Sequence, residues 1–129
     1  MEAETRLLAL AGELATLPAG DVVAPALRAL AAAYAPGAPL PRAVAQAALR
    51  SHADKISVLA LAWARERVRL ALEELLVRTP PRGTLPGGAD TRSWLILAAC
   101  EAMALEPPSA VADRLRVLLE ITGHAADPA

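Results

Sequence analysis

The chain has 129 residues, the size of one domain, and 55% of them are hydrophobic, which allows a sizeable core. Its 13 Lys and Arg are balanced by 14 Asp and Glu with no cluster of either sign, so we expect no direct binding to nucleic acid. The single cysteine, Cys100, excludes an internal disulfide and a metal site built on paired cysteines.

Two further absences bear on location. No basic segment precedes an apolar stretch after Met1, so the sequence predicts no signal peptide. The longest apolar run, residues 94–105, is far shorter than the ~20 residues that a membrane span requires. We therefore expect a cytoplasmic protein that makes no contact with a membrane.

Apolar periodicity and the positions of Pro and Gly predict an all-α domain of five to six helices in an orthogonal or bundle arrangement. Asp21, Asp90 and Ser109 are the expected N-caps of the second, fifth and sixth helices. The segment 51–54 either caps the fourth helix or only bends the chain before it. We expect one domain over residues 1–123 and a disordered tail over 124–129, with helices at 2–16, 21–34, 41–50, 53–78, 91–105 and 110–122.

The helix at 53–78 carries apolar residues on two faces, which predicts packing on both sides and a central position in the domain. Charged residues between these faces are expected to form a solvated strip. One face holds Ile56, Leu59, Trp63, Leu70 and Val77; the other holds Leu61, Val68, Leu72 and Leu75; and the strip holds Arg65, Glu66, Arg69 and Glu73.

The helix at 91–105 is apolar nearly all round, and a chain of this length can hardly cover such a helix by itself. We therefore expect a second copy to cover part of it, beside the amphipathic helix at 110–122. Glu101 is its one acidic residue after position 94. That side chain is expected to face solvent, or else to be a buried carboxylate, a ligand contact or an inter-chain partner.

The sequence offers no catalytic arrangement. His52 and His124 stand alone, without the acidic or histidine neighbours of a metal site. No Ser or Thr lies in a nucleophile motif, and no Gly-rich loop has the spacing of a phosphate cradle. Arg67 and Glu74 fall within an apolar stripe, where they either line a polar cavity or lie at the rim of the core. We expect no enzyme activity, no metal and no cofactor.

Several motifs together resemble the C-terminal regulatory half of tetracycline-repressor-type transcription factors. They are the long helix at 53–78, the loop Arg82-Gly83-Thr84-Leu85-Pro86 with Asp90, the run from Ala98 to Leu105, and the stretch from Leu115 to Gly123. The family's helix-turn-helix is absent from this chain, so the resemblance does not imply that the chain binds DNA. Ala102 stands where many relatives have Gly.

The resemblance implies a non-enzymatic ligand-binding and dimerisation domain. Its middle helices would enclose a small, mostly apolar ligand, with Tyr34, Trp63 and Arg67 as the candidate contacts. Its last two helices would form a homodimer through Trp94, Leu97, Cys100, Glu101, Ala104, Leu115, Leu118 and Thr122. The alternative is a small structural or adaptor protein with a filled core. A pocket of roughly 300 Å³ or more among the second, third and fourth helices would favour ligand sensing.

Overall fold

Six α-helices and one short 3₁₀ helix make up the regular structure of this chain in a computed structural model, which describes residues 2–18, 20–50, 54–81 and 83–123. No strand occurs in these ranges, so the predicted all-α class is confirmed. The elements are α1 (Glu2–Ala15), α2 (Val23–Ala33), α3 (Pro39–Arg50), α4 (Lys55–Arg78), α5 (Ala89–Ala102), η2 (Met103–Leu105) and α6 (Pro108–Ile121).

Most predicted helix ends are off by one to three residues, because the caps differ from those expected. Asp54 caps α4 and accepts hydrogen bonds from the backbone N–H groups of Ile56 and Ser57. Gly88 and Pro107 precede α5 and α6, so Asp90 lies inside the first turn of α5 and Ser109 inside that of α6. Val22, not Asp21, is the N-cap of α2. The expected roles of residues 51–53 and of the tail 124–129 fall outside the described residues.

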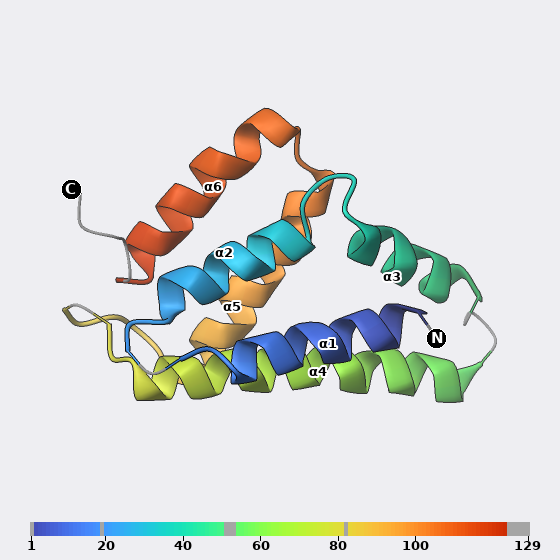
Figure 1. The fold of residues 1–129 in the computed structure, drawn as a ribbon, viewed down its shortest axis with the longest axis horizontal. Coiled ribbons are helices and arrows are strands. Elements are labelled where there is room, and N and C mark those ends of the chain that lie inside the picture. Colours follow the sequence, from blue (N-terminus) through green and yellow to red (C-terminus); the bar gives the residue numbers. More distant parts are fainter. Residues whose placement is uncertain (1, 19, 51–53, 82, 124–129) are drawn as a thin grey trace.

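The long helix α4 forms one side of the domain, with α1 alongside it (Figure 1). Next comes α5, which packs against α4 and is crossed by α2. The last helix, α6, packs on α2 at the opposite side of the molecule, and α3 contacts α1 at one end. Leucine and alanine side chains fill the space between α1, α2, α4 and α5 because the chain has no Phe and only three aromatic residues in all.

The predicted packing of α4 on two faces is wrong for the single chain. Val68, Leu72 and Leu75 are fully buried against neighbouring helices, as expected. The face that holds Trp63 remains exposed because no described helix covers it; α1 only flanks this face and forms one wall of a groove beside Trp63 and Leu70. The predicted solvated strip is also corrected, since α5 covers much of Arg69 and pairs with Arg65.

Candidate ligand cavity

Side chains from five helices surround a cavity of about 260 Å³. The cavity lies where α2 and α3 approach the α1–α4 pair, with α5 at its inner end. Its walls are mostly apolar, and its polar groups are one phenol, one guanidinium and one carboxylate. The lining residues are Leu7, Tyr34, Val44, Val58, Leu61, Ala62, Arg65 and Glu101.

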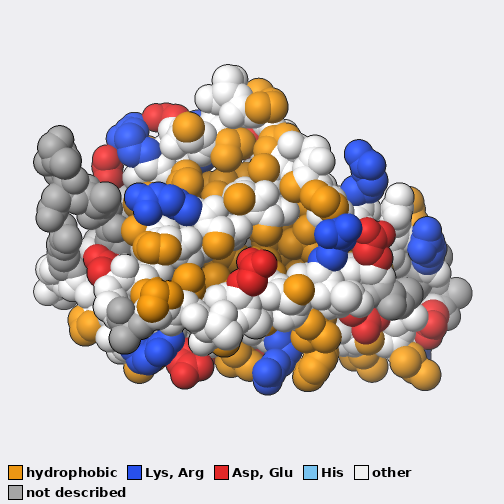
Figure 2. Space-filling view, in the orientation of Figure 1, with side chains coloured by type: hydrophobic (Ala, Val, Ile, Leu, Met, Phe, Trp, Pro, Cys, Tyr) orange, Lys and Arg blue, Asp and Glu red, His pale blue; other side chains and the backbone are white. Residues whose placement is uncertain are grey.

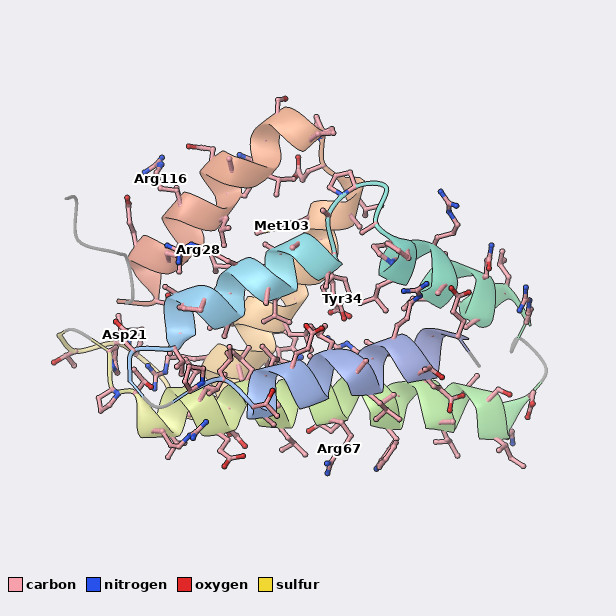
Figure 3. All side chains as sticks on the ribbon, in the orientation of Figure 1. Asp21, Arg28, Tyr34, Arg67, Met103 and Arg116 are labelled. Atoms are coloured by element: carbon pink, nitrogen blue, oxygen red, sulfur yellow. The ribbon has the colours of Figure 1, made fainter. Side chains whose placement is uncertain are left out.

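Tyr34 is the C-cap residue of α2, and only 4% of it is exposed to solvent. Its position at the end of α2, on the opposite side of α4 from Arg67, is seen in Figure 3. The Tyr34 hydroxyl is not among the buried polar atoms that lack a partner, since Arg92 Nε is the one such side-chain atom in the described ranges. Burial raises the pKa of Tyr34, and the negative charge of Glu101 raises it further, so the phenol is neutral and able to donate a hydrogen bond.

Arg65 and Glu101 close the cavity with a two-pronged ion pair between α4 and α5. The Arg65 Nε donates to Glu101 Oε2 at 2.8 Å, and its Nη2 donates to Oε1 at 2.7 Å. Hydrogen bonding to Glu101 raises the pKa of Arg65 further above its already high value. About a third of each side chain is exposed, so the pair is partly solvated and is not sealed in the core.

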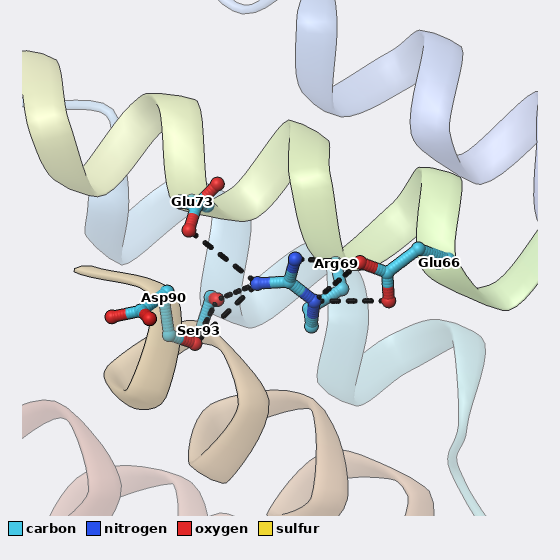
Figure 4. A network of polar contacts seen from close by, with 5 residues as sticks. All are labelled: Glu66, Arg69, Glu73, Asp90 and Ser93. Carbon is cyan, nitrogen blue, oxygen red and sulfur yellow. Dashed lines mark hydrogen bonds and ion pairs between the residues drawn. The ribbon is translucent and has the colours of Figure 1, made fainter. Parts of the chain in front are cut away.

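A second polar cluster ties α4 to the start of α5 (Figure 4). The Arg69 Nε donates to Glu66 at 2.9 Å, and Nη1 donates to the Ser93 hydroxyl at 2.9 Å. The Ser93 hydroxyl in turn donates to the backbone carbonyl of Asp90 at 2.7 Å, and Glu73 Oε1 lies 3.5 Å from Arg69 Nη1. This cluster and the Arg65–Glu101 pair together hold α5 at two points along α4.

The three ligand contacts inferred from the family resemblance do not come together. Tyr34 lines the cavity, whereas Trp63 and Arg67 lie on the exposed side of α4. There the Arg67 guanidinium carbon stacks 5.7 Å from the centre of the Trp63 ring. Arg65, which does line the cavity, was missed because helix periodicity placed it on a solvated strip. Its proximity to Glu101 depends on tertiary packing and leaves no signal in the local sequence.

The expected interface residues divide into two sets. Leu97 and Cys100 are fully buried in the chain's own core, and Leu118 and Thr122 are nearly so, which leaves little of them for a second chain. Trp94 is exposed, Ala104 and Leu115 are half-buried, and Glu101 pairs with Arg65 within the chain. Between α5 and α6 lies a groove of about 380 Å³, lined by Ala99, Ala102, Met103, Glu106, Asp113, Arg114, Val117, Leu118 and Ile121.

The described residues hold no group of three His, Cys, Asp or Glu side chains that is suited to a metal ion. Burial, together with the Glu101 charge, raises the pKa of the Cys100 thiol to about 12, so almost none of it is the reactive thiolate at neutral pH. Among the helices of the described ranges, none has both the length and the apolar character needed to cross a membrane. Comparison with family models, curated proteins and solved structures found no match to this chain.

Proposed function

We propose that the chain is the ligand-sensing and dimerisation domain of a cytoplasmic regulator of the tetracycline-repressor type, without catalytic activity. The observation that carries this proposal is the mostly apolar cavity of about 260 Å³, which is lined by Tyr34 and by the Arg65–Glu101 ion pair. The neutral Tyr34 phenol offers a ligand one hydrogen bond at an otherwise apolar wall, and such a bond contributes about 0.5–1.5 kcal/mol.

The chemistry of the walls favours a small neutral ligand. Arg65 and Glu101 already satisfy one another, so a charged ligand would have to compete with an existing two-pronged ion pair. The remaining walls are apolar, apart from the Tyr34 hydroxyl. A volume of about 260 Å³ suits one ring or a short chain with a single hydrogen-bonding group.

Glu101 links the cavity to the proposed dimer contact, because it lies on the same helix as residues that line the α5–α6 groove. Its carboxylate lines the cavity, while its neighbour Ala102 and nearby Ala99 line the groove beside α6. A ligand that alters the Arg65–Glu101 pair would therefore shift α5 relative to α6. We place the proposed dimer contact at this groove and at the exposed Val117 and Ile121, in place of the buried Leu97 and Cys100.

The charge distribution supports the proposal that the chain does not bind DNA itself. Arg65 and Arg69 both pair with carboxylates of the same chain, and the net charge is −1. A DNA-binding surface needs several free cationic groups along one face. If the domain acts on DNA, it does so through another domain or another protein.

The test uses phenol and toluene, two probes of similar size that differ in one hydroxyl group. Binding is followed by NMR shifts of the Val44, Val58 and Leu61 methyl groups, which line the cavity. We expect phenol to bind more tightly than toluene, and Tyr34→Phe to weaken phenol binding about 2- to 10-fold without affecting toluene. Leu61→Trp should fill the cavity and abolish both. Equal phenol binding by the original protein and the Leu61→Trp variant would refute the ligand site.

A structural or adaptor role is the second candidate. One observation favours it: the cavity is smaller than the roughly 300 Å³ that we set as the mark of a ligand pocket. An adaptor would function unchanged when the cavity is filled. If Leu61→Trp raises the melting temperature and neither probe shifts the cavity methyl groups of the original protein, the adaptor is the better description.

A further inference from the structure

Four large apolar side chains form an exposed row along α4. Ile56, Trp63, Leu70 and Val77 recur every seven residues, and each is between 41% and 79% exposed. A seven-residue apolar repeat keeps one seam of a helix facing a partner helix over its whole length. Scattered exposed apolar residues are common in monomers, but four in one heptad row are typical of a helix that pairs with another.

A groove of about 400 Å³ runs beside this row, between α4 and α1. Small residues of α1 form its floor, among them Ala11, Gly12 and Ala15. A methyl group added at Gly12 would meet no atom within 4 Å, so the floor is open to incoming side chains. The row and the groove together make one surface, which we call the α1–α4 face.

The charges on the α1–α4 face are self-complementary. Arg67 and Glu74 both line the groove, seven residues apart, on either side of Leu70. Neither forms an ion pair with another residue in the described part of the chain. Figure 3 shows Arg67 projecting from α4 away from the other helices, and Figure 2 shows exposed hydrophobic side chains alternating with charged ones along this edge.

We propose that a second copy of this chain binds the α1–α4 face, with its α4 antiparallel to the first and the two-fold axis at Leu70. In this register, two residues that face one another across the helix pair have numbers that add up to about 140. Leu70 packs on the partner's Leu70, and Trp63 on the partner's Val77. Residues on the same flank of the seam meet in an antiparallel pair, so Arg67 lies beside the partner's Glu74 and Glu74 beside the partner's Arg67. In a symmetric parallel pair, each residue would lie level with its own copy, so these reciprocal pairs would be lost.

The size of the face fits a weak, reversible contact. Residues 62–78 overlap in this register, which is about 25 Å of helix at ~1.5 Å per residue, so Trp63, Leu70 and Val77 are paired and Ile56 lies beyond the contact. The α1–α4 layer is roughly 20 Å wide, because packed helices lie about 8–10 Å apart. The contact would bury about 500 Å² per chain and roughly 1,000 Å² in all, near the lower limit for a specific interface. We therefore expect a dissociation constant in the micromolar range.

This contact is independent of the proposed dimer at the α5–α6 groove, since the two surfaces lie on opposite sides of the domain. The test is therefore carried out in an Ile121→Glu background, which removes the other contact at a 65% exposed position. Sedimentation equilibrium at 1–100 μM measures self-association of the chain. If Ile121→Glu alone abolishes all self-association, the α1–α4 contact is refuted and the proposed α5–α6 dimer remains.

Charge swaps decide the register. In the same background, Arg67→Glu should weaken association about tenfold because two attractive pairs become repulsive, and Glu74→Arg should do the same. The double variant Arg67→Glu/Glu74→Arg should restore affinity to within about threefold. Leu70→Glu should abolish association, whereas Leu105→Glu, a control at a 91% exposed position off this face, should leave it unchanged. Failure of the double variant to restore association, or equal effects of Leu70→Glu and Leu105→Glu, would overturn the proposal.

Discussion

Removal of the Arg69 guanidinium is expected to loosen the joint between α4 and α5. Its side chain is only 14% exposed, and it bonds to the fully buried Ser93 on one side and to Glu66 on the other. A hydrogen bond that involves a charged group contributes about 1.5–3 kcal/mol. The hydrogen bond to Glu66 contributes less than this to the free energy of unfolding, because that carboxylate is 45% exposed and screened by water. We therefore expect Arg69→Met to lower the free energy of unfolding by about 2–3 kcal/mol.

The assay is urea and thermal unfolding followed by circular dichroism at 222 nm. For a domain of this length the expected loss corresponds to a fall in melting temperature of roughly 10 °C. The stability of Arg69→Lys should lie between that of the original protein and that of Arg69→Met, since an ammonium keeps the charge but not the fork-shaped set of donors. Arg116→Met is the matched control, because Arg116 also bridges two carboxylates but is 60% exposed within α6 alone. Equal losses for Arg69→Met and Arg116→Met would refute the idea that Arg69 braces two helices.

Two further predictions follow from burial and charge. Cys100 should resist thiol reagents at pH 8 for hours in the folded protein and react fully in denaturant, because burial raises the pKa of its thiol to about 12. Complete labelling within minutes in native buffer would contradict the buried position of Cys100. The Arg69 guanidinium lowers the pKa of Glu66, so the stabilisation from Glu66 is complete above the unfolded-state value of about 4.3 and is lost as the pH falls through the lower folded value. Glu66→Gln should therefore be less stable than the original protein at pH 7, and the difference should shrink as the pH falls below about 4.3, whereas a difference of undiminished size at pH 2.5 would exclude this linkage.

The number and approximate limits of the helices could be predicted from the sequence because they depend on local physics. Proline has no N–H group and a fixed φ, so it is disfavoured inside helices and tolerated in their first turn. The segments at 36–41, at 79–89 and at Pro107-Pro108 therefore mark the boundaries between consecutive helices. Gly123 lies just after the last helix, and its φ of +73° is the left-handed conformation that glycine adopts most readily. The exact caps were harder to predict, because Asp21, Asp90 and Ser109 were all plausible acceptors near a helix start.

Which side of a helix is buried was decided by the tertiary structure alone. Both faces of α4 are apolar, so periodicity could not tell that Val68 and Leu72 would be buried while Trp63 and Leu70 would remain exposed. The cavity likewise combines Tyr34, Arg65 and Glu101 from three helices, and their meeting depends on how α2, α4 and α5 cross. A helical sequence specifies the angles at which its side chains point, whereas the neighbour that each side chain meets is set by packing among helices far apart in the chain.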